Sequence, residues 1–107
     1  MFLVIVVSSD APSTLETTCG LASAAAGRGH GVTIFFYMEG VRLLEASRVG
    51  DLLVSLVSAG VRLLACRTSV HEWGIGSGDG LVEGVEMSSL GELVDLLDGF
   101  DRAVFLG

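Results

Sequence analysis

The fold is decided by the stretch Phe2-Leu3-Val4-Ile5-Val6-Val7, an uninterrupted apolar run rich in β-branched residues. Such a run is typical of a strand that is buried on both faces, as strands of parallel sheets are. The run is much shorter than the roughly 18–20 apolar residues of a membrane-spanning helix. It also lacks the basic residues that begin a secretory signal. We therefore expect a buried strand in a cytoplasmic protein.

Strand and helix patterns alternate along the rest of the chain. Further strands are predicted at 32–37, 60–66, 82–87 and 102–106, and helices at 13–26, 41–48, 51–58 and 89–97, with a helical turn at 70–73. This alternation, with short connections, predicts an α/β fold in which helices cover both faces of a parallel sheet. A chain of 107 residues suits one domain, spanning 1–107.

Serine and glutamate spacing indicates where two of these helices begin. Ser13 with Glu16, and Ser89 with Glu92, have the three-residue spacing of a capping box. The helix at 51–58 is apolar on nearly all sides, which predicts that it packs between the sheet and a second subunit.

The amino-acid composition limits the kinds of molecule that the protein is expected to bind. The net charge is −7 and all six basic residues are arginine, a balance that disfavours nucleic acid and anionic membrane surfaces. Two cysteines, Cys19 and Cys66, are too few for a disulfide scaffold or a zinc site, so we predict no metal and no cofactor. Half of the residues are hydrophobic, and a domain this small buries only roughly 60–65% of its unfolded surface, so we expect a homo-oligomer.

Cys66 is the candidate reactive residue. It closes the strand at 60–66, and open α/β sheets bind ligands beyond the carboxyl ends of their strands. Arg67 and His71 follow it closely and would stabilise a thiolate. Buried cysteines are common in strands, so packing remains an alternative. The residues expected to line the same crevice are Ser8, Ser9, Asp10, Thr68 and Ser69.

Three other sequence features are interpreted without a catalytic role. Cys19 falls on the apolar stripe of the first helix, where a free cysteine acts as a small hydrophobe. The glycines at 27–31 follow a helix and precede a strand, which is typical of a helix end. The segment Gly74–Gly80 lacks the Lys-Ser/Thr of a phosphate-binding loop, so we interpret it as a flap over the site.

Several segments occur in the order and spacing of a known family. They are an aromatic strand with an acidic-Gly-Val turn at 31–41, the cysteine-bearing strand at 60–69, a strand-to-helix segment at 84–93, and a last strand beginning at 101–104. Together they make essentially the whole chain resemble the DsrE/DsrF-like family of sulfur-relay proteins.

The resemblance implies a three-layer α/β/α sandwich with a five-stranded, mainly parallel sheet. It implies that Cys66 carries sulfane sulfur as a persulfide between donor and acceptor proteins. It also implies trimers or hexamers, or assembly with a paralogue. Many members have Arg-Gly-Ile after the cysteine, where this chain has Trp73-Gly74-Ile75, so Arg67 or His71 would supply the positive charge. The alternative is a non-catalytic oligomeric module that binds a small ligand or a partner, with Cys66 structural.

Overall fold

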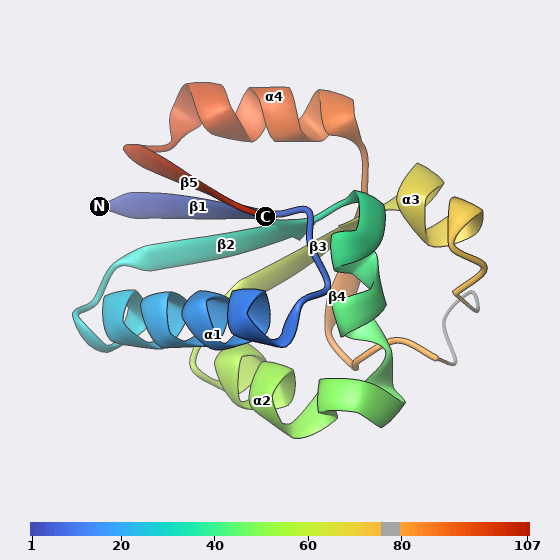
Figure 1. Ribbon diagram of the computed structural model, residues 1–107. Coiled ribbons are helices and arrows are strands. Elements are labelled where there is room, and N and C mark those ends of the chain that lie inside the picture. Colours follow the sequence, from blue (N-terminus) through green and yellow to red (C-terminus); the bar gives the residue numbers. More distant parts are fainter. Residues whose placement is uncertain (76–79) are drawn as a thin grey trace.

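The sheet has five strands, all parallel, in the order β4-β3-β2-β1-β5 (Figure 1). The computed structural model describes residues 1–75 and 80–107, without the side chains of 46–50, so most of the flap expected at Gly74–Gly80 lies outside the described residues. The strands are β1 (Phe2–Val7), β2 (Gly31–Phe36), β3 (Arg62–Cys66), β4 (Val85–Ser88) and β5 (Arg102–Leu106). The prediction of a five-stranded parallel sheet is confirmed.

Helices cover both faces of this sheet, so the expected three-layer sandwich is also confirmed (Figure 1). The helices are α1 (Pro12–Gly27), the 3-10 helix η1 (Met38–Leu44), α2 (Ala46–Ser58), α3 (Arg67–Glu72) and α4 (Leu90–Gly99). α1 and α2 lie on one face and α4 on the other, while α3 extends from the carboxyl end of β3. Over the described ranges, no helix has the length and apolar character needed to cross a bilayer.

Alternate residues of the inner strands build two separate cores, which is why these strands are apolar throughout. Ile5, Ile34 and Leu63 belong to the core on the α1 and α2 face. Their neighbours along the same strands, including Val4 and Leu64, belong to a smaller core with Leu93 of α4.

The two predicted capping boxes had different outcomes. Ser13 does not cap α1, because Pro12 takes the first helical position and Ala11, which has no capping side chain, precedes it. Proline is favoured at that position because its φ is fixed near the helical value. Ser89 does cap α4, and its Oγ accepts a hydrogen bond from the backbone N–H of Glu92 at 3.1 Å.

Some predicted boundaries were wrong. The helices expected at 41–48 and 51–58 are instead η1 followed by α2, which begins at Ala46 and ends at Ser58. η1 passes close to β1, and a Cβ on Gly40 would overlap the carbonyl oxygen of Val7. The helical turn expected at 70–73 begins earlier, at Arg67, and β4 begins at Val85 rather than at 82.

Candidate functional site

Cys66 is the last residue of β3 and directly precedes α3. Its side chain is 3% exposed and belongs to the core on the α4 face. The other buried members of that core are Val4, Val6, Phe35, Leu64 and Leu93. The thiol at the strand end therefore lies within apolar packing in this structure.

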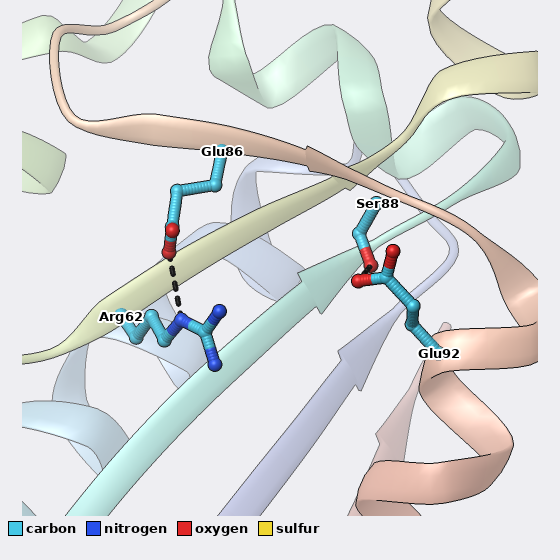
Figure 2. A network of polar contacts seen from close by, with 4 residues as sticks. All are labelled: Arg62, Glu86, Ser88 and Glu92. Atoms are coloured by element: carbon cyan, nitrogen blue, oxygen red, sulfur yellow. Dashed lines mark hydrogen bonds and ion pairs between the residues drawn. The ribbon is translucent and has the colours of Figure 1, made fainter.

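A buried hydroxyl lies beside Cys66 on the neighbouring strand. Ser88 is the partner of Cys66 in the parallel register of β3 and β4, so both side chains point to the same face. The Ser88 hydroxyl donates a hydrogen bond of 2.8 Å to the carboxylate of Glu92 (Figure 2). Further along the strands, the exposed Arg62 and Glu86 form an ion pair of 2.7 Å. The polar groups that flank Cys66 across β4 are thus a hydroxyl and a carboxylate.

Arg67 and His71 lie at a cavity that Cys66 does not line. Both side chains are exposed, and within the described residues neither makes a hydrogen bond or ion pair. The cavity measures about 910 Å³, and its apolar wall includes Val70, Ile75, Leu81, Val82, Val85 and Met87. Met87 packs against the core on the α1 and α2 face, opposite the core of Cys66. The fold therefore places Arg67 and His71 at this cavity, whereas the thiol of Cys66 faces α4.

The three polar residues after β1 are tied to different neighbours. Ser8 Oγ donates a hydrogen bond of 3.4 Å to the carbonyl oxygen of Leu106 in β5. Ser9 Oγ accepts one of 3.1 Å from the backbone at the start of α1. The carboxylate of Asp10 pairs with the guanidinium of Arg42 at 3.2 Å. They thus line the carboxyl end of β1 and connect it to β5, α1 and η1.

Thr68 and Ser69 differ in burial and in role. Thr68 is exposed, whereas Ser69 is buried and its Oγ accepts a hydrogen bond of 2.8 Å from the backbone N–H of Met38. The carbonyl oxygen of Ser69 accepts one of 3.0 Å from the backbone N–H of Trp73. The Arg42 guanidinium lies 5.3 Å from the centroid of the Trp73 ring, a cation–π contact.

Sequence reasoning did not find this contact between η1 and α3. Asp10, Arg42 and Trp73 come from three separate segments, and no local pattern links them. Met38, at the start of η1, has a φ of 53°, an uncommon value for a residue with a side chain. Over the described part of the chain, no three histidine, cysteine or acidic side chains gather closely enough to hold a metal ion.

Cys19 lies on the apolar side of α1 and packs against the larger core, as its position in the sequence predicted. Burial raises the pKa of its thiol above the ordinary value of 9.0.

Fold and site together define a class of small α/β sandwich proteins with a cysteine at the carboxyl end of an inner parallel strand. Within that class, the chain belongs to the DsrE/DsrF-like family, whose model matches residues 1–106. No curated protein matches the chain.

Solved structures share the whole fold. The protein of unknown function MTH1491 from Methanobacterium thermoautotrophicum is similar, with a TM-score of 0.86, 22% identity and 97% of each chain covered. The ychN protein from E. coli gives a TM-score of 0.82 at 23% identity, covering 98% of this chain and 99% of its own. The protein of unknown function BT1422 from Bacteroides thetaiotaomicron gives 0.73 at 17% identity, covering 97% of this chain and 93% of its own. At these identities the likeness shows the fold alone.

Proposed function

We propose that the protein is a cytoplasmic sulfur-relay protein that carries sulfane sulfur as a persulfide on Cys66. Membership of the DsrE/DsrF-like family supports a role in sulfur relay. The observation that carries the assignment to Cys66 is its position at the carboxyl end of β3, where parallel α/β sheets place their reacting groups.

The chemistry is thiol–disulfide exchange. The Cys66 thiolate attacks the outer sulfur of a donor persulfide, a new S–S bond forms, and the donor's own sulfur leaves as a thiolate. An acceptor thiolate then attacks the outer sulfur on Cys66, which in turn leaves as a thiolate. Both steps need the sulfur of Cys66 to be accessible. Because this side chain is 3% exposed, the relay includes an opening step that uncovers it from the core beneath α4.

Polysulfide treatment followed by intact-protein mass spectrometry tests the proposal. The wild type and Cys19→Ser should gain the mass of one sulfur atom per chain, and Cys66→Ser should not. Uptake by Cys66→Ser together with loss in Cys19→Ser would refute the assignment.

A second candidate function is a non-catalytic oligomeric module in which Cys66 only packs. The observation that favours it is the burial of Cys66 among Val4, Val6 and Leu93. Iodoacetamide labelling separates the two candidates. A relay cysteine is labelled in the native protein, whereas a structural one is labelled only after denaturation.

We also propose that the chain forms a homo-oligomer, a trimer or hexamer, or assembles with a paralogue. Leu90 and Val94 of α4 are 52% and 65% exposed, one helical turn apart. Phe105 of β5, 63% exposed, points to the same face, because its neighbours Val104 and Leu106 pack against the α1 and α2 core. A monomeric mass in light scattering at micromolar concentration would contradict this proposal. The net charge of −7 favours protein partners over nucleic acid or anionic membranes.

A further inference from the structure

A small hollow lies between the start of η1 and the end of α3, apart from the large cavity beside Arg67. It measures about 350 Å³ and is lined by Met38, Glu39, Glu72 and Trp73. Its two apolar side chains are unusually exposed, Met38 at 56% and Trp73 at 41%. Exposed apolar side chains beside two carboxylates suit a ligand that has both an apolar surface and a polar or charged group.

The backbones of Met38 and Trp73 and the Trp73 ring are held in place by neighbouring residues. Ser69 accepts hydrogen bonds from the backbone N–H groups of both Met38, at 2.8 Å, and Trp73, at 3.0 Å. Arg42 lies over the Trp73 ring, 5.3 Å from its centroid, and is fixed there by its ion pair with Asp10 at 3.2 Å. The hollow is therefore formed before any ligand arrives, which reduces the entropic loss on binding.

The charge on the hollow favours a cation. Glu39 and Glu72 are both exposed, and neither makes an ion pair with another described side chain. An indole ring attracts cations over its face, and a carboxylate adds a direct charge interaction. Arg42 does not line the hollow, and Asp10 offsets its charge. The Arg42–Trp73 contact also shows that this indole accepts a guanidinium group.

We propose that this hollow binds an arginine side chain of a partner protein. A guanidinium group is planar, stacks on aromatic rings and pairs with carboxylates through two parallel hydrogen bonds, so it suits Trp73 and the two glutamates. An acidic chain with a net charge of −7 would also attract a partner that carries this residue on a basic surface.

The position of the hollow links it to the proposed relay, and this link rests on the proposed function. Only α3, six residues long, separates Cys66 from Trp73. At 1.5 Å per residue, that helix spans about 9 Å. A donor or acceptor protein with an arginine in the hollow would therefore hold its reacting sulfur within reach of the carboxyl end of β3.

Trp73 is the only tryptophan of the chain, so its fluorescence reports directly on the hollow. The full chain is titrated with N-acetyl-arginine amide, and with N-acetyl-citrulline amide as a neutral probe of the same shape. We expect a saturable change with the arginine probe and none with the citrulline probe. The Glu39→Gln/Glu72→Gln variant should weaken arginine binding at least tenfold, whereas Glu16→Gln, an exposed carboxylate on α1, should leave it unchanged. Added salt should weaken binding in the wild type.

Three outcomes would overturn the proposal: no saturable change with the arginine probe, an equal response to the citrulline probe, or unchanged binding in the double variant. Because Gln preserves shape at exposed positions, circular dichroism should show the variant folded. Sulfur uptake from polysulfide tests the relay separately. The double variant should still take up sulfur, and Cys66→Ser should still bind the arginine probe, so failure of one proposal is distinguishable from failure of the other.

Discussion

Replacing Ser69 by alanine should destabilise the protein through one backbone group. The Ser69 hydroxyl accepts a hydrogen bond of 2.8 Å from the partly buried backbone N–H of Met38. Alanine leaves that N–H without its acceptor, and a buried donor that loses its partner costs about 1–3 kcal/mol. In a domain of this size, each 1 kcal/mol lowers Tm by about 4–8 °C.

Ser55→Ala provides a matched control. Ser55 is also a helical serine with a hydrogen bond of 2.8 Å, but it is exposed and its hydroxyl donates to the carbonyl oxygen of Leu52. Water replaces that bond, and both variants gain the same few tenths of a kcal/mol in helix propensity. Urea unfolding followed by circular dichroism should therefore show Ser69→Ala about 1–3 kcal/mol less stable than Ser55→Ala, with equal m-values. Equal stability of the two variants would refute the assigned role of Ser69.

Four further substitutions should alter the stability of the protein in defined directions. Gly40→Ala should lower the free energy of unfolding by about 1–3 kcal/mol, because the new Cβ meets the rigid backbone of β1. Gly20→Ala, in open space on α1, should raise it by about 0.5–1 kcal/mol. The midpoints of urea unfolding compare the two variants. Ser89→Ala should cost about 0.5–2 kcal/mol by removing the cap of α4, measured in the same way, and an unchanged midpoint would contradict the capping role. Burial raises the pKa of the Cys19 thiol in the folded state, so the unfolded chain ionises first as the pH rises. The stabilising contribution of the neutral thiol is complete below the ordinary pKa of 9.0 and is lost above it. The free energy of unfolding should therefore fall less between pH 8 and pH 10 in Cys19→Ala than in the wild type.

The fold could be predicted because each inner strand is recognisable from its own run of apolar residues. Inner strands are buried on both faces, so runs such as 2–7 are apolar without interruption. The errors arose where tertiary packing overrode a local preference. A helix break was expected between Arg48 and Asp51, but α2 continues through Gly50. Glycine costs a helix about 1 kcal/mol, and the burial of Leu53 and Leu56 provides more than that.

The candidate site was harder to predict, because neighbours in sequence do not always share a face. Cys66, Arg67 and His71 lie within six residues, yet Cys66 ends a strand and the other two belong to the helix that follows. The change from strand to helix turns the side chains of Arg67 and His71 toward the cavity and leaves the thiol facing α4. The contact between Arg42 and Trp73 depends on how η1 lies against α3, which no sequence period encodes.

The position of β1 between β2 and β5 has a consequence for the order of folding. The bond from the Phe2 backbone to Asp101 closes a loop of 99 residues, whereas Met1 and His30, where β1 meets β2, are 29 residues apart. Loop-closure entropy grows with the logarithm of loop length, so the longer closure costs about 1 kcal/mol more. During synthesis, β1 can pair with β2 early, but its other edge stays open until the last strand leaves the ribosome. β1, an inner strand of the finished sheet, is therefore an unprotected edge until β5 has been made.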